Sequence, residues 1–172
     1  ASFMLMASMN PCPCGYYNHP DRVCSCGPGM VQKYLNKISG PLLDRIDLHV
    51  EVTPVAFSEL SAIRPAEPSS AIRDRVIKAR EIQAERYKKN PGVYCNAQMS
   101  SKQLKEICVI NSVGANLLKV AMQKLNLSAR AYDRILKVSR TIADLCDSPD
   151  IKPEHLAEAI HYRSLDREGW GG

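Results

Sequence analysis

The sequence has 172 residues, of which 45% are hydrophobic and 24% charged, proportions that are ordinary for a soluble globular protein with one core or two small ones. It contains no apolar run near the roughly 18–20 residues needed to cross a bilayer and no secretion signal, so we expect a cytoplasmic protein without a membrane partner. The formal net charge is +5, and the segment 71–90, with seven basic and three acidic residues, carries +4 of it.

The chain opens on a short apolar run at residues 3–8, which ends before Asn10 and Pro11. Such a run is typical of a central strand in a parallel sheet, and because a buried strand is an unusual start, we expect a part of a longer protein. Residues 47–52 alternate polar and apolar side chains, as a half-buried strand does. We therefore predict two strands within residues 1–55, the C-terminal end of an α/β core, and a linker at 56–68.

Four of the seven cysteines lie close together in a predicted loop or insertion at 11–29. Without a secretion signal, such a cluster indicates metal binding more than disulfides. Four thiolates satisfy the tetrahedral preference of Zn²⁺, and His19 could replace one of them. The alternative is a set of reduced thiols in a flexible insertion. The predicted zinc ligands are Cys12, Cys14, Cys24 and Cys26.

Helices are predicted for residues 30–38 and for most of the chain from residue 69 onward. The N-terminal signals of the later helices are N-cap residues, a capping box formed by Ser100 and Gln103, and a proline in the first turn. The first of these helices is expected to run to about Asn90. The predicted fold class is α+β and mainly α, with a bundle of about five helices at 69–172. The marked starts are Ser69 or Ser70, Ser100, Ser112, Ser128 and Pro153.

The basic segment 71–90 has two interpretations. Its cations could follow the phosphate backbone of a nucleic acid. A charge run is more often a solvated helix face, and the three interleaved acids favour that alternative. The segment contains one aromatic residue, Tyr87, which is too few for a platform on which bases stack.

Three polar residues are candidates for nucleotide chemistry. Asn10 directly follows the first predicted strand, where ligands of open α/β sheets bind, or it simply caps a turn before Pro11. Arg45, near Asp44 and Asp47, is a local ion-pair anchor or presents its guanidinium to a phosphate of a neighbouring subunit. Arg130 follows the N-cap Ser128, where a cation opposes the helix dipole unless an anion binds there. An exposed arginine that tolerates this small cost is the alternative.

Several ordered motifs resemble the magnesium-chelatase-like AAA+ ATPases, which include the bacterial competence-associated proteins. The resemblance covers nearly the whole chain. Its motifs are Asn10-Pro11-Cys12-Pro13-Cys14-Gly15, Ser39-Gly40-Pro41-Leu42-Leu43-Asp44-Arg45-Ile46-Asp47-Leu48, Leu127-Ser128-Ala129-Arg130-Ala131-Tyr132-Asp133-Arg134-Ile135-Leu136, Thr141-Ile142-Ala143-Asp144-Leu145 and Tyr162-Arg163-Ser164-Leu165-Asp166-Arg167.

The resemblance implies that residues 1–55 end an AAA+ α/β core and that 69–172 form its helical lid, the C-terminal domain. It implies that Asn10 is the sensor-1 residue, Arg45 an arginine finger acting in trans on the next subunit, and Arg130 the sensor-2 arginine that contacts ATP. The expected parent is an ATP- and Mg²⁺-dependent motor that forms a homo-oligomeric ring, a hexamer, and acts on DNA in transformation or recombination.

The sequence also departs from the family pattern. The phosphate loop G-x-x-x-x-G-K-[ST] and the acidic Mg²⁺-binding motif are not found among the 172 residues, so we expect them upstream in the parent and expect this chain alone to be inactive. Two alternatives stay open: the motor subunit of a magnesium chelatase, and a non-catalytic, zinc-stabilised helical adaptor. The cysteine insertion and the motif beginning at Ser39 favour the competence-associated branch.

Overall fold

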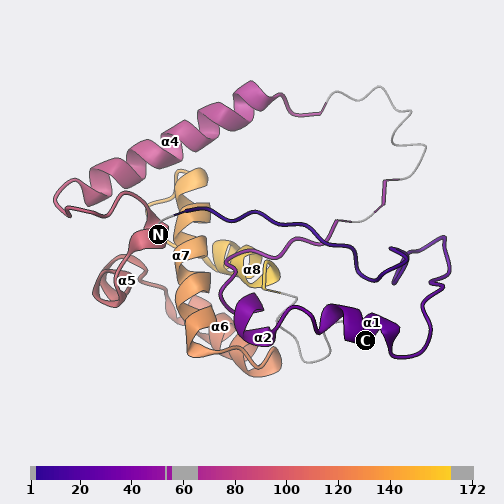
Figure 1. Cartoon of the computed structure of the whole chain (residues 1–172). Helices are drawn as coiled ribbons and strands as arrows, with labels where there is room; N and C mark the ends of the chain where they lie inside the picture. The colour runs from indigo at the N-terminus through magenta and orange to yellow at the C-terminus, as the bar shows by residue number, and fades with distance from the viewer. Residues whose placement is uncertain (1–2, 53, 56–65, 164–172) are drawn as a thin grey trace.

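The computed structural model describes residues 3–52, 54–55 and 66–163, and these residues are mainly helical (Figure 1). The two short helices α1 and α2 lie in the N-terminal third. The remaining helices follow residue 68, as the sequence predicts. The elements are α1 (Met30–Leu35), α2 (Gly40–Leu43), α4 (Ser69–Tyr87), the 3₁₀ helix η1 (Asn96–Gln98), α5 (Ser101–Ile107), α6 (Ser112–Lys124), α7 (Ala129–Leu145) and α8 (Pro153–His161).

Helix α7 is the centre of the hydrophobic core. It packs against α8, α4, η1 and α5, and α8 also packs against α6. The sequence predicts a buried stripe on α7 from apolar residues at spacings of three and four, namely Ile135, Val138, Ile142 and Leu145. Ile135 and Ile142 are buried, whereas Val138 and Leu145 are half-buried. Leu118 of α6 and Leu156 of α8 close the core from the other side. The helical bundle at 69–163 therefore has a core of its own.

The helix starts agree in part with the N-cap predictions. Ser100 and Gln103 form the predicted capping box of α5, and Ser128 caps α7 by accepting a hydrogen bond from the backbone N–H of Ala131. Helix α6 is capped by Asn111, not by Ser112, because the Asn111 side chain lies before the helix and accepts from the N–H of Gly114. Helix α4 begins at Ser69 directly after Pro68, so Ser69 and Ser70 are helical and neither is its cap.

The two predicted strands are not confirmed. Residues 3–8 and 47–52 are described, and neither segment is a strand; Phe3 is 78% exposed and Met4 91%. The described residues contain one isolated bridge, between Ile110 and Ile151. A strand must pair its backbone N–H and C=O groups with a neighbouring strand, and the described residues offer none beside these segments. Most of the predicted linker at 56–68 lies outside the described residues.

Helix α4 is the longest of the described helices, and its first half stands clear of the bundle (Figure 1). Its side chains are exposed up to Lys78, and burial begins at Ala79, followed by Gln83 and Tyr87. The helix thus docks through its C-terminal half alone. Of the helices that the structure describes, none combines the length and the apolar character that crossing a membrane requires.

Candidate functional site

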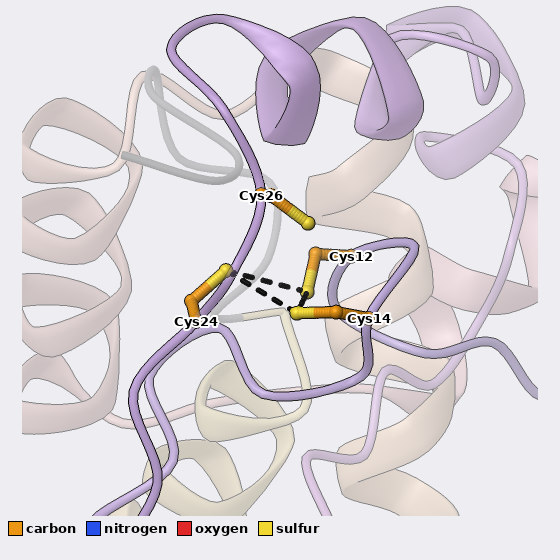
Figure 2. Close-up of side chains that lie close together, drawn as sticks. All are labelled: Cys12, Cys14, Cys24 and Cys26. Carbon is orange, nitrogen blue, oxygen red and sulfur yellow. Dashed lines mark hydrogen bonds between the residues drawn. The ribbon is translucent and has the colours of Figure 1, made fainter.

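The four predicted zinc ligands lie together in the loop before α1 (Figure 2). All four Sγ atoms are within 4.8 Å of one another. The Sγ of Cys12 is 3.3 Å from that of Cys14 and 3.8 Å from that of Cys24, and Cys14 and Cys24 are 3.5 Å apart. Zn–S bonds of about 2.3 Å in a tetrahedron place sulfurs roughly 3.8 Å apart. The thiols are free rather than bridged, so the arrangement fits a Cys₄ zinc site.

Local turns bring the first pair of cysteines into position. The N–H of Gly15 donates to the carbonyl of Cys12 at 3.0 Å, and Gly15 has φ 82°, a conformation that glycine adopts without strain. The N–H of Tyr17 donates to the Sγ of Cys12 at 3.3 Å. His19 is not part of the cluster: its Nδ1 accepts from the N–H of Asp21 at 3.1 Å. The cysteines, not His19, therefore make the candidate site.

The sulfurs perturb one another's protonation. Hydrogen bonding, first from the backbone N–H of Tyr16, lowers the pKa of Cys14 to about 5. The N–H of Cys26 favours the Cys24 thiolate, but desolvation and the sulfurs of Cys14 and Cys12 outweigh it and raise the pKa of Cys24 to about 12. The pKa of Cys26 is also raised. Four thiolates this close repel one another, and a bound cation would remove that repulsion.

A second set of contacts joins the segment around α2 to the start of α7. The Oγ of Ser128 donates a hydrogen bond of 2.7 Å to the Oδ1 of Asp44, and Asp44 also lies 3.8 Å from the guanidinium of Arg163. Asp47 pairs with Arg134 of α7. The N–H of His49 donates to the carbonyl of Tyr162 at 2.8 Å. The motif around Arg45 is thus fixed on the helical bundle by the residues that flank the arginine.

Arg45 itself remains exposed. Its Nη1 donates to the carbonyl of Pro41 at 3.0 Å, while the carboxylates of Asp44 and Asp47 contact other residues. Arg130 is exposed at the second position of α7, two residues after the N-cap Ser128. The Asp44–Ser128 hydrogen bond therefore brings the segments that carry Arg45 and Arg130 together.

Asn10 lies elsewhere, exposed at the end of the extended segment that leads into the cysteine loop. No hydrogen bond among the described residues connects it to Arg45 or to Arg130. The structure thus links the segments that carry Arg45 and Arg130, through Asp44 and Ser128, and does not link that of Asn10 to either.

A buried network of polar side chains was not predicted from the sequence. Asp144 of α7 is 2% exposed and accepts hydrogen bonds from Arg86 of α4 at 2.7 and 2.5 Å, from Asn96 of η1 at 2.8 Å and from Arg140 at 3.1 Å. The bond to Asp144 raises the pKa of Arg86 above its ordinary value. The i,i+4 spacing of Arg140 and Asp144 in the sequence indicates one of these contacts. The contacts of Asp144 with Asn96 and Arg86 span 48 and 58 residues, and no sequence pattern indicates them.

Two family profiles match the chain. The profile described as "Magnesium chelatase, subunit ChlI C-terminal" matches residues 66–163, and that described as "Magnesium chelatase, subunit ChlI" matches residues 1–60. The chain belongs to the magnesium-chelatase family. The resemblance inferred from the motifs is confirmed, and the boundary between the two family regions falls within the predicted linker.

Curated relatives in this family extend the comparison. The chain is 45% identical over 168 residues to the competence protein ComM of Haemophilus influenzae, and 41% identical over 170 residues to the uncharacterized protein YifB of Escherichia coli. Each match covers 97% of the chain and 32% of the relative. A Mycobacterium bovis relative, the uncharacterized protein Mb2921c, is 35% identical over 163 residues, or 95% of the chain. The chain thus spans about a third of the length of these relatives.

Proposed function

We propose that this chain is the C-terminal part of a cytoplasmic AAA+ ring motor that hydrolyses ATP and acts on DNA. Membership of the magnesium-chelatase family supports the motor, and the relative named a competence protein supports DNA as its substrate. Among the described residues, the group of three or more metal-ligating side chains that lie together is the four cysteines, and thiolates suit Zn²⁺ rather than Mg²⁺. The phosphate loop and the acidic Mg²⁺-binding motif are not found among the 172 residues, and we assign both to other parts of the full-length protein.

The proposal rests on the exposure of Arg45 and on the contacts of the two carboxylates near it. Asp44 and Asp47 could have neutralised this arginine, yet they contact Ser128, Arg163 and Arg134 instead. An exposed guanidinium without a neutralising carboxylate can stabilise the charge that develops on a phosphoryl group during its transfer. We assign Arg45 this role on the nucleotide of the neighbouring subunit.

Arg130 is proposed to contact the phosphates of ATP. It lies in the first turn of α7, where its positive charge opposes the helix dipole by a few tenths of a kcal/mol. An anion bound at this helix end would reverse the cost, because free N–H groups and the guanidinium would bind it together. Movement of α7 with the nucleotide would then couple the helical bundle to hydrolysis. Asn10 keeps its proposed role as the sensor-1 residue.

The cysteine cluster is proposed to hold one structural Zn²⁺. Cys12, Cys14, Cys24 and Cys26 supply all four ligands of a closed tetrahedral site. A closed site leaves no position for a substrate or water, so the metal would order the loop before α1 rather than take part in catalysis.

The ATPase activity of the full-length protein, with and without single-stranded or branched DNA, tests the proposal. We expect turnover that DNA stimulates. Turnover that DNA does not affect, together with Mg²⁺ insertion into a porphyrin, would favour the second candidate, a chelatase motor subunit, to which the family description points. If the pure, assembled full-length protein does not hydrolyse ATP, the motor function is contradicted. The non-catalytic, zinc-stabilised adaptor would then be the remaining hypothesis.

A further inference from the structure

A groove runs along the exposed face of α4 and under the loop that follows the helix. It encloses about 680 Å³ and is lined by Ile77, Arg80, Ala84 and Lys88 on the helix side and by Pro91 and Tyr94 on the loop side. The groove lies on a face of α4 other than the one through which Ala79 and Gln83 are buried. Two further lining residues, Tyr87 and Val93, belong to the core or pack against it, so the groove borders the core. None of its lining residues comes from the segment that carries Arg45.

Cations are regularly spaced along this face. Arg73, Ile77, Arg80, Ala84 and Lys88 follow one another at intervals of four, three, four and four, which places them on one side of a helix. At 1.5 Å per residue, Arg73 and Arg80 are about 10 Å apart along the axis, and Arg80 and Lys88 about 12 Å. One carboxylate, that of Glu81, also lines the groove, so the positive charge predominates.

Carboxylates of the described residues neutralise only part of the positive charge of α4. Of the seven basic residues in 71–90, Arg75 pairs with Glu67, Arg86 with Asp144, and Lys88 with the exposed Glu85 at 3.4 Å. The ion pairs of the described residues include none for the other four, Arg73, Lys78, Arg80 and Lys89. Exposed pairs such as Lys88–Glu85 are weak and exchange readily for a phosphate.

An aromatic ring stands at the edge of the same groove. Tyr87 is buried, so it cannot stack on a base. Tyr94, however, is 75% exposed, and its backbone is fixed by a hydrogen bond of 2.7 Å from its N–H to the Oε1 of Gln98. The tight turn at Gly92, with φ 84°, carries the chain back toward α4. The ring is thus presented beside the cations.

We infer that this groove binds single-stranded nucleic acid. The spaced cations complement phosphates, and Tyr94 offers a face for one unstacked base, the combination by which proteins hold single strands without reading sequence. An acidic protein would use the cations but would have no need of the ring. The inference rests on the proposed action on DNA and names a site for it, outside the nucleotide-contacting residues.

Binding of a fluorescent 20-residue oligo-dT to the zinc-loaded 172-residue chain tests the inference, with anisotropy measured over a series of salt concentrations. Tyr94→Ala should weaken binding about 5- to 150-fold, the range for loss of one stacked base. Arg80→Gln and Lys88→Gln should each reduce the slope of log K against log salt by about 0.7. Tyr132→Ala on α7 and Arg75→Gln, on the opposite side of α4, are matched controls that should leave binding unchanged. Circular dichroism should be the same for all variants.

A crosslinking measurement does not depend on variants. An oligonucleotide containing 5-bromodeoxyuridine should crosslink to the tryptic peptide 90–102, which contains Tyr94. Equal weakening by Arg75→Gln and Arg80→Gln, polyglutamate that competes as well as oligo-dT, or crosslinks that avoid this peptide would each overturn the site. If these tests contradict the groove but DNA still stimulates the ATPase activity of the full-length protein, the inference is wrong and the proposed function is retained.

Discussion

A single carboxylate, that of Asp144, joins three segments of the helical bundle. It receives hydrogen bonds from Arg86 of α4, Asn96 of η1 and Arg140 of its own helix. The apolar contacts of α4 are few, since Ala79, Gln83 and Tyr87 are its buried residues. The network therefore joins with the core residue Tyr87 to attach α4, and thereby the groove beside it, to α7.

Asp144→Ala should lower the free energy of unfolding by about 3–5 kcal/mol, because Arg86 and Arg140 would stay partly or fully buried without a counter-charge. Urea denaturation measures this change. Asp150→Ala, at an exposed position, is the control and should cost less than about 0.5 kcal/mol. A cost for Asp144→Ala below about 1 kcal/mol would show that the network does not hold α4 in place.

At the scale of single elements, the N-caps of α6 and α7 show how local signals and their surroundings combine. Ser128 caps α7 and at the same time binds Asp44, so a residue predicted for a local reason also positions the segment of Arg45. For α6, Asn111 and Ser112 are both good N-cap residues. The parallel bridge of Ile110 with Ile151 fixes the chain just before the helix, and the cap falls on Asn111.

Asn111→Ala should therefore lower the free energy of unfolding by about 1 kcal/mol, the usual cost of a lost N-cap, since the N–H of Gly114 loses its partner. Ser112→Ala, one residue on, should have little effect. Thermal denaturation of the two variants provides the comparison. Equal losses of stability, or a larger loss for Ser112→Ala, would contradict Asn111 as the N-cap and favour the predicted N-cap Ser112 instead.

Features that depend on residues close together in the sequence could be predicted from it, whereas features that depend on distant residues could not. Helices after residue 68, the capping box at Ser100 and the four cysteines rest on residues within about fifteen positions of one another, and these were found. The two predicted strands are not confirmed, because strand pairing depends on neighbours that the described residues do not supply. The contacts of Asp44 with Ser128 and of Arg86 with Asp144 span more than fifty residues, and no local pattern encodes them.

At the scale of the whole molecule, the cysteine loop and the helical bundle should respond differently to metal. The buried residues of the main core all lie between Tyr87 and Ala159, and the four cysteines of the cluster lie outside that core. Loss of the metal should therefore disorder the loop while the bundle keeps its helices.

Elemental analysis of protein purified without added metal should find about one zinc per chain. Chelation should release it and increase hydrogen exchange in residues 10–30, with little change in helical circular dichroism. Cys12→Ser should abolish binding, whereas Cys146→Ser, at an exposed cysteine outside the cluster, should not affect it. A metal-free protein whose residues 10–30 are fully protected would contradict the zinc site.

The central claim is that Arg45 acts on the nucleotide of a neighbouring subunit. The measurement that tests it most directly is the ATPase activity of mixed rings of the full-length protein. Arg45→Ala alone should lower turnover by about 10³- to 10⁵-fold with ATP binding retained, because charge stabilisation in the transition state is lost. Mixed with subunits altered only in their phosphate loop, the Arg45→Ala subunits should regain activity, since each can receive an intact arginine from its neighbour. Mixed rings that assemble but stay as inactive as either parent would contradict the claim and make Arg45 a structural residue.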